Sequence, residues 1–242
     1  MKDTAFTLIS NRPVAKNTYE WVLSGDTKGI REGQFVNIKL DGFYLRRPIS
    51  VCDCEGDKLT LIFKVVGDGT KVMSEAKVGE KFLILTGLGN GYNLAKSGHA
   101  PLLIGGGAGV PPMYLAAKKL VAKGVTPTVI LGFNTADEVF YKDEFESLGC
   151  KVLITTADGS VGIKGFVTNA MAELEYTYFY TCGPLPMLRA VYNASVTDGE
   201  FSFEERMGCG FGACMGCSCE TKYGYKRICR DGPVLMKEEI VW

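Results

Sequence analysis

Hydrophobic and polar positions alternate with a period of two along residues 1–96. Thr18–Ser24, Gln34–Leu40 and Lys58–Val66 alternate or are rich in β-branched and aromatic residues, and glycine-rich turns separate them. Lys81–Thr86 is another short apolar run, and Thr70–Lys77 is the only segment in this part that we predict as a helix. About six short strands over this length indicate a small antiparallel β-barrel.

The hydrophobic period changes over residues 97–200, where short apolar runs alternate with longer amphipathic segments. Strands that alternate with helices predict a parallel sheet with helices on both faces, so we expect an α/β domain here. The predicted strands are Leu102–Ile104, Thr128–Phe133, Lys151–Thr155 and Tyr178–Thr181, and the predicted helices are Pro112–Ala122, Ala136–Ser147, Gly165–Leu174 and Pro184–Ser195.

Residues 201–242 form a third part with a different pattern. Phe201–Glu205 predicts one more strand, and Lys222–Arg227 predicts a hairpin. Between them the chain reads C-G-F-G-A-C-M-G-C-S-C. We therefore expect a barrel over 1–96, an α/β domain over 97–200 and a small C-terminal region over 201–242.

Charge and hydropathy limit the partners and the cellular compartment that we expect for this chain. The chain has 27 Lys and Arg residues and 27 Asp and Glu residues, and this balance argues against nucleic acid as a partner. No apolar run approaches the roughly 20 residues of a membrane span, and the N-terminus lacks the apolar core of a signal peptide. We expect a cytoplasmic protein, and in that reducing compartment a cysteine cluster binds metal or does redox work rather than forming disulfides.

Two glycine-containing turns follow predicted strands of the α/β part. Gly107, Gly109 and Pro112 form G-x-G-x-x-P, which lets a backbone approach a pyrophosphate at a helix N-terminus. Cys182-Gly183-Pro184 also follows a strand and opens a helix, so it is expected at the same carboxyl edge of the sheet. A turn without a ligand remains the alternative for each.

The barrel has two further candidates for phosphate binding. Arg47-Pro48-Ile49-Ser50 offers a guanidinium and a hydroxyl, and Gly69-Thr70 precedes the predicted helix. Either stretch could also be an ordinary turn.

The cysteine spacing is the most specific pattern in the chain. Cys209, Cys214 and Cys217 form C-x4-C-x2-C, the plant-type [2Fe–2S] pattern, and Cys229 is the candidate fourth ligand. Structural zinc and disulfides are weaker alternatives, and a Rieske centre is excluded because it needs two histidines and the chain has one. Cys219 competes for a ligand place, and we interpret it as a bystander.

Taken together, these motifs resemble the ferredoxin–NADP reductase superfamily. Its R-x-[YF]-[ST] motif appears as Arg47 to Ser50, with Ile49 in place of the aromatic residue that usually stacks on the flavin. The resemblance implies FAD on the barrel, with Ile62, Phe63 and Lys64 added to its binding residues, and a nicotinamide dinucleotide on the α/β domain.

Within that superfamily the chain resembles the iron–sulfur electron-transfer subunit of type B dihydroorotate dehydrogenase. The similarity lies in F-E-E-R-M-G-C-G-F-G-A-C-M-G-C at 203–217 and in G-L-G-N-G-Y at 87–92. It implies a [2Fe–2S] cluster and a partner, the FMN-containing catalytic subunit, in a heterotetramer. It also implies a role in pyrimidine biosynthesis, in which electrons pass through the cluster and FAD to NAD⁺.

Other relatives with this architecture remain as alternatives: small subunits of NADPH:ferredoxin transhydrogenase, sulfide dehydrogenase and hydrogenase. The first two often have an aspartate in place of one cluster cysteine, so four cysteines favour the dihydroorotate system.

Asp137, after the second α/β strand, would repel a 2′-phosphate, which favours NAD. No acid, base or nucleophile constellation stands out, so we predict no catalytic side chain. Phe211 and Met215 are candidates for a partner contact beside the cluster.

Overall fold

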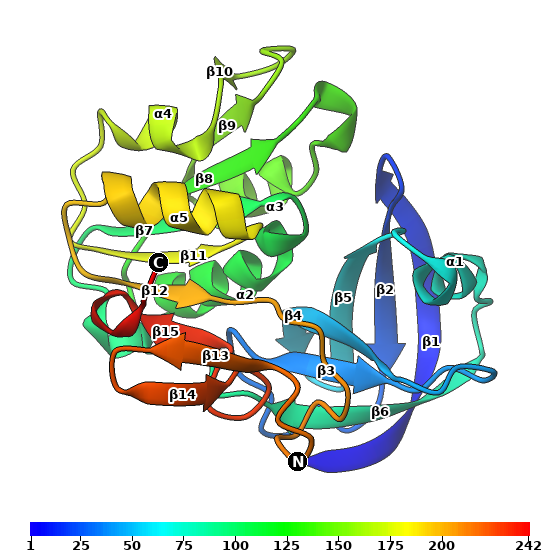
Figure 1. Ribbon diagram of the computed structural model, residues 1–242. Helices are drawn as coiled ribbons and strands as arrows, with labels where there is room; N and C mark the ends of the chain where they lie inside the picture. The colour runs from blue at the N-terminus through cyan, green and yellow to red at the C-terminus, as the bar shows by residue number, and fades with distance from the viewer.

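The computed structural model describes residues 1–242, and Figure 1 shows a β-barrel beside an α/β unit, with a C-terminal hairpin below the sheet. The barrel is closed and antiparallel, with the strand order β1-β2-β5-β4-β3-β6. Its strands are β1 Lys2–Ala15, β2 Thr18–Ser24, β3 Phe35–Ile38, β4 Arg47–Glu55, β5 Lys58–Lys64 and β6 Lys81–Leu88. The prediction of a six-stranded antiparallel barrel is confirmed.

Alternation along the strands decides what faces the barrel interior. Val36 and Ile38 of β3 are buried in the barrel core. Phe35, on the opposite face of the same strand, is buried in a second hydrophobic cluster outside the barrel. The helix α1 (Asp68–Glu75) closes one side, because Met73 enters the barrel core and Trp21 Nε1 donates to the Met73 carbonyl at 3.1 Å. The barrel wall therefore has an inner face that packs and an outer face that is free to meet the rest of the chain.

The second unit is a seven-stranded sheet in the order β10-β9-β8-β7-β11-β12-β15, parallel except for the edge strand β15. Helices cover both faces, as predicted (Figure 1). The strands are β7 Pro101–Gly106, β8 Thr128–Phe133, β9 Lys151–Thr156, β10 Ile163–Lys164, β11 Tyr178–Cys182, β12 Gly199–Ser202 and β15 Val234–Met236, and the α-helices are α2 Val110–Val121, α3 Lys142–Ser147, α4 Val167–Met171 and α5 Leu185–Ala194.

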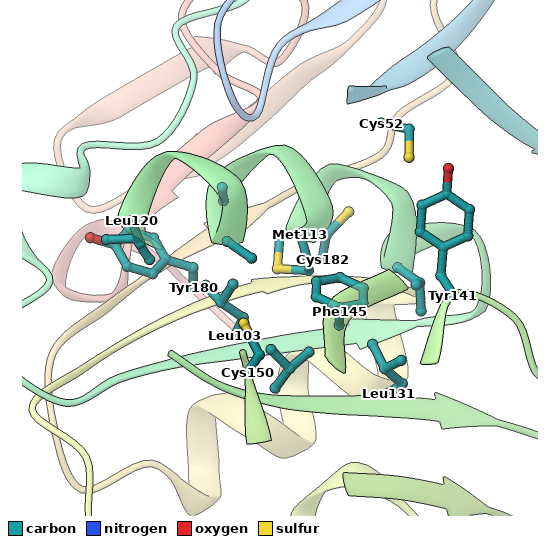
Figure 2. Packing of buried hydrophobic residues seen from close by; sticks show 14 of the residues in the cluster. Cys52, Leu103, Met113, Leu120, Leu131, Tyr141, Phe145, Cys150, Tyr180 and Cys182 are labelled. Carbon is teal, nitrogen blue, oxygen red and sulfur yellow. The ribbon is translucent and has the colours of Figure 1, made fainter. Parts of the chain in front are cut away.

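One predicted helix is divided in the structure. Instead of Ala136–Ser147, a 3₁₀ turn, η3 (Ala136–Glu138), precedes α3, and Tyr141 between them has φ of 66°. The interruption has a tertiary cause, because Tyr141 Oη donates to the buried Glu20 carboxylate of β2 at 2.8 Å. Figure 2 shows Tyr141 beside Cys52 of the barrel, in the core that also contains Met113 of α2. The barrel and the sheet thus share one hydrophobic core.

The C-terminal region is attached to both units. Its hairpin, β13 (Ser218–Thr221) and β14 (Gly224–Arg227), follows the cysteine loop, and β15 then joins the edge of the large sheet. Asn90, in the turn after β6, accepts from Val234 N at 3.1 Å and donates to Val234 O at 2.8 Å. The short 3₁₀ turns η1 (Leu94–Lys96), η2 (Gly107–Gly109) and η4 (Lys237–Glu239) complete the chain, and none of its helices has the length and apolar character that a membrane span requires.

Candidate functional site

A cavity of about 370 Å³ lies on the outside of the barrel, against the C-terminal region. It collects residues that are far apart in the sequence, from β4, β5, the start of α1 and the stretch after β12. Eight of the predicted flavin-site residues line it, namely Arg47, Pro48, Ile49, Ser50, Ile62, Phe63, Lys64 and Thr70. The cavity wall also contains two aromatic residues that were not predicted for the flavin site: Phe35, which belongs to no motif, and Phe203, which begins the motif at 203–217.

The two arginines of this stretch have different environments. Arg46 forms a bidentate ion pair with Asp3, in which both N–O distances are 2.8 Å. Arg47 instead lies over the start of α1, and a Cβ on Gly69 would come within 2.0 Å of Arg47 Nε. Gly69 therefore does not line the cavity but leaves room for the guanidinium beside a helix N-terminus. A cation and free N–H groups together form a surface suited to phosphate.

A larger cavity, about 590 Å³, lies at the carboxyl edge of the parallel sheet. Gly107, Gly109, Gly183 and Pro184 line it, so the two predicted turns do face one another. Pro112 and Cys182 do not line it, since both are buried behind its wall. Sequence reasoning missed the other contributors, which include Asn134, Glu138, Thr155, Phe166 and Met187.

Close packing explains why glycine is needed in the first turn. A Cβ on Gly109 would lie 2.1 Å from the carbonyl oxygen of Cys182, and a Cβ on Gly106 would lie 2.3 Å from Met187 Sδ. Gly107 is different, because it has a φ of +51° with open space around it. The turn is therefore held against the second turn by backbone contact, and its backbone N–H groups remain accessible to a ligand.

The two cavities meet at Lys64, Ala108 and Glu204, which line both of them. Lys64 Nζ forms an ion pair with Glu138 at 2.6 Å, joining the barrel to the α/β unit at this point. Glu204 is exposed to the two cavities, and partial desolvation by the protein atoms around it raises the pKa of its carboxyl group. Ligands in the two cavities would touch here.

The carboxylate that faces the larger cavity is not the one that the sequence suggested. Asp137 forms an exposed ion pair with Lys16 at 2.8 Å and does not line the cavity. Glu138 lines it and is oriented by Asn134 Nδ2, which donates to Glu138 Oε2 at 2.9 Å. The turn η3 directs the Asp137 and Glu138 side chains to different sides, and no pattern in the sequence indicates which of them faces the cavity.

The four candidate cluster cysteines meet in the structure as two pairs. Cys214 N donates to Cys209 Sγ, and Cys229 N donates to Cys217 Sγ, both at 3.4 Å. No three side chains of His, Cys, Asp or Glu are arranged around a single point. Two pairs of thiols fit a centre with two iron atoms, since each iron of a [2Fe–2S] cluster takes two protein ligands.

Backbone amides surround the sulfur atoms. Ala213 N and Cys214 N donate to Cys209 Sγ at 3.2 and 3.4 Å, and Cys229 N donates to Cys217 Sγ at 3.4 Å. Burial raises the pKa of Cys209, but backbone donors outweigh it and lower that pKa to about 6. Burial and the neighbouring Cys217 raise the pKa of Cys229 to about 12. The loop thus stabilises at least one thiolate before any metal binds.

Cys219 lies apart from this arrangement. It is on β13 opposite Lys226, and its Sγ contacts the carbonyl oxygen of Glu220. Burial raises the pKa of its thiol. This position agrees with the interpretation of Cys219 as a bystander, because Cys219 lies on a strand outside the two cysteine pairs.

The outer face of β3 separates the barrel cavity from the cysteine loop. Phe35 lines the cavity and also packs in the cluster that contains Cys217 and Cys229. Asn37, on the same face and 1% exposed, donates from Nδ2 to the Cys209 carbonyl at 3.4 Å. Alternation along β3 would have placed these two residues on one face, but the sequence does not indicate what that face meets.

Comparison with known proteins agrees with this geometry. Residues 204–241 match the model of the iron-sulfur cluster binding domain of dihydroorotate dehydrogenase B, and residues 103–193 match the oxidoreductase NAD-binding domain. In structure, the chain is similar to the NADH-dependent reduced ferredoxin-NADP oxidoreductase that was studied for flavin-based electron bifurcation. The TM-score is 0.89 and the identity 30%, over 98% of this chain and 90% of that chain.

Two relatives carry the name dihydroorotate dehydrogenase B (NAD(+)), electron transfer subunit. The protein of Fusobacterium nucleatum subsp. nucleatum is 43% identical over 99% of both chains. That of Geobacillus sp. (strain WCH70) is 44% identical over 100% of this chain and 99% of its own. Since the similarity extends over nearly the whole length of each protein, this chain belongs to the family of dihydroorotate dehydrogenase B electron transfer subunits, as its motifs predicted.

Proposed function

We propose that this chain is the electron transfer subunit of a dihydroorotate dehydrogenase that uses NAD⁺, and that it acts in pyrimidine biosynthesis. Electrons from a catalytic subunit enter at the cysteine loop and leave on NAD⁺ at the carboxyl edge of the sheet. When bound, FAD would take electrons singly from a cluster and give them as a hydride to nicotinamide, which is the conversion that this function needs.

The observation that carries the proposal is the arrangement of three sites in sequence. The cysteine loop contacts Asn37 of β3, Phe35 of the same strand lines the barrel cavity, and the barrel cavity meets the sheet-edge cavity at Lys64, Ala108 and Glu204. Each site thus adjoins the next, so an electron does not have to cross solvent between them. We assign FAD to the barrel cavity, the dinucleotide to the sheet edge and the [2Fe–2S] cluster to the loop.

This assignment of the three cofactors gives individual residues the following roles. Arg47 and the start of α1 would hold the FAD phosphates, and the turns at Gly107–Gly109 and Gly183–Pro184 would hold NAD. Cys209, Cys214, Cys217 and Cys229 would be the cluster ligands. The corresponding units are residues 1–96 for FAD, 97–200 for NAD and 201–242 for the cluster, although β15 from the last unit completes the sheet of the second.

The partner would be the FMN-containing catalytic subunit, in a cytoplasmic heterotetramer. The loop offers a contact surface, because Phe211 is 45% exposed and Met215 is 55% exposed. Cys214 is also exposed, so one ligand lies at the surface that a partner would cover. Apolar tips around an exposed ligand support an electron entry point at this surface.

Anaerobic purification of the chain with its native partner tests the proposal. We expect flavin absorption, a broad cluster absorption, two irons per chain and reduction of NAD⁺ by dihydroorotate. Zinc in place of iron would refute the cluster assignment. A native complex without an FMN protein that oxidises dihydroorotate would refute the partner.

A second candidate has one specific observation in its favour. The structural similarity to the reduced ferredoxin-NADP oxidoreductase extends over 98% of this chain. A small subunit of that kind would copurify with a different large subunit and would reduce NADP⁺ with ferredoxin. The four cysteines and the 43% identity to the dihydroorotate family favour the first candidate.

A further inference from the structure

The cysteine loop is held from outside by a charged side chain. Arg227 ends β14, and its Nη1 donates to the Gly212 carbonyl oxygen at 2.9 Å. Its Nε donates to Asp231 Oδ2 at 3.0 Å, and the Arg227 side chain is only 22% exposed. Gly212 lies between Cys209 and Cys214, so this hydrogen bond reaches the middle of the ligand loop.

The peptide that Arg227 holds is one that contacts sulfur. The Gly212 carbonyl and the Ala213 N–H belong to the same peptide unit, and in a trans peptide these two groups point in opposite directions. The carbonyl accepts from Arg227, and the N–H donates to Cys209 Sγ at 3.2 Å. A charged donor on the carbonyl polarises the peptide and strengthens the bond from its N–H.

Gly212 is suited to this double contact. It has a φ of +91°, and a Cβ there would lie 2.7 Å from Arg230 Cδ. Arg227 therefore fixes the carbonyl of a peptide unit whose N–H, that of Ala213, donates to Cys209 Sγ.

We propose that Arg227 is a positioning residue for the iron–sulfur site and that, together with Asp231, it sets the reduction potential of the cluster. The inference rests on the proposed function and deepens it. Reduction adds one negative charge to the cluster, so a nearby cation and a strengthened N–H bond to sulfur favour the reduced form. Asp231 partly neutralises that cation, and its charge has the opposite effect.

Potentiometric titration followed by low-temperature EPR tests this assignment on the full chain in its native complex. Arg227→Gln removes the charge and should lower the potential by about 59 mV, which is tenfold in the equilibrium constant of a one-electron couple. Arg227→Lys keeps the charge but loses the planar fork, so we expect a smaller decrease. Asp231→Asn should raise the potential.

Arg230→Gln is the matched control. Its charge change is identical, and its methylene groups pack on Gly212, but the Arg230 side chain forms no hydrogen bond or ion pair. The Arg230 side chain is also exposed, so solvent screens its charge, and Arg230→Gln should shift the potential much less than Arg227→Gln does. FAD content should stay at the level of the unchanged protein in all four variants, which separates an effect on the cluster from general unfolding.

The outcomes separate this inference from the function on which it rests. If the unchanged protein has a cluster, and Arg227→Gln shifts its potential no more than Arg230→Gln does, the role of Arg227 is refuted and the function stands. Equal signs for Arg227→Gln and Asp231→Asn would also refute it. An unchanged protein without iron or an EPR signal would refute the proposed function, and the assignment of Arg227 with it.

Discussion

The turn at Gly105–Gly109 and the loop at Cys209–Cys217 are both rich in glycine, but their glycines meet different requirements. At Gly109 the backbone is close to a neighbouring backbone, because a Cβ would lie 2.1 Å from the Cys182 carbonyl oxygen. In the cysteine loop, Gly210 and Gly212 have φ of +78° and +91°, and even Met215 has φ of +61°. Gly109 is thus required for space, because its neighbour is backbone, whereas Gly210 and Gly212 are required for conformation as well as for space.

The difference shows how each site is built. The glycine turn lies between β7 and α2, so regular hydrogen-bonded elements hold it in place. The cysteine loop has no regular structure, and it depends on Asn37 and Arg227, which hold two of its carbonyl groups, and on N–H bonds to sulfur. The dinucleotide site is therefore preformed, whereas the cluster site is completed by its metal.

Loss of a cluster ligand should have the largest effect. Cys217 is 2% exposed and contacts Cys229, so Cys217→Ser removes a thiolate from the interior of the loop. We expect complete loss of the cluster, with FAD retained because the barrel cavity does not include Cys217. Iron analysis and the visible spectrum measure both.

Cys219→Ser provides the control, since Cys219 lies on β13 and takes no part in either thiol pair. Its iron content should match that of the unchanged protein. Cluster loss in Cys219→Ser with a normal cluster in Cys229→Ser would overturn the ligand assignment and the pairing on which the comparison depends.

Substitution of Gly109 tests the preformed site. Gly109→Ala should destabilise the protein by about 3 kcal/mol, the upper end of typical overpacking costs, because the added methyl group meets backbone rather than a movable side chain. NAD binding should be lost while the cluster spectrum persists. Chemical denaturation and nucleotide titration measure the two effects.

Gly124→Ala is the control that measures the cost of backbone conformation without a steric clash. Gly124 has a φ of +79° and nothing within 4 Å, so only backbone strain of about 1 kcal/mol should appear, with normal NAD binding. If Gly109→Ala cost no more than Gly124→Ala, the turn would not be held by backbone contact.

The barrel site combines features of the other two, a helix start and one long side chain. Arg47→Ala removes the cation beside Gly69, so we expect FAD affinity to fall by about 10- to 100-fold, from the roughly 1.5–3 kcal/mol of a charged hydrogen bond. Fluorescence titration of the apoprotein with FAD measures it. Arg46→Ala should leave the affinity unchanged, because Arg46 is engaged with Asp3; a similar loss in both variants would argue against a phosphate contact at Arg47.

The smallest expected effect concerns the choice between NAD and NADP. Glu138 lines the sheet-edge cavity and Asp137 does not. Glu138→Gln removes a negative charge from the cavity and should raise the ratio of NADPH to NADH activity by about fivefold, from roughly 1 kcal/mol of repulsion. Asp137→Asn should not change the ratio; the opposite result would return the role to Asp137.

Local patterns predicted much of this architecture. Alternation indicated the barrel, the change of period indicated the parallel sheet, and cysteine spacing identified the residues that the structure pairs. The errors have tertiary causes. The helix expected over Ala136–Ser147 is interrupted where Tyr141 reaches Glu20 of the barrel. Glu138 could not be distinguished from Asp137, because both are acidic and only the turn η3 directs one of them into the cavity.

The sequence by itself determined the types of element, the four-cysteine pattern and the membership of a family, since these depend on residue type and spacing along the chain. Only the tertiary structure decided that Phe35 both lines the barrel cavity and belongs to the cluster of Cys217 and Cys229. It also decided that Lys64 and Glu204 line two cavities at once, and that Arg227 holds a peptide bonded to Cys209. These relations join residues more than a hundred positions apart in some cases, and such contacts arise from packing, which no local pattern specifies.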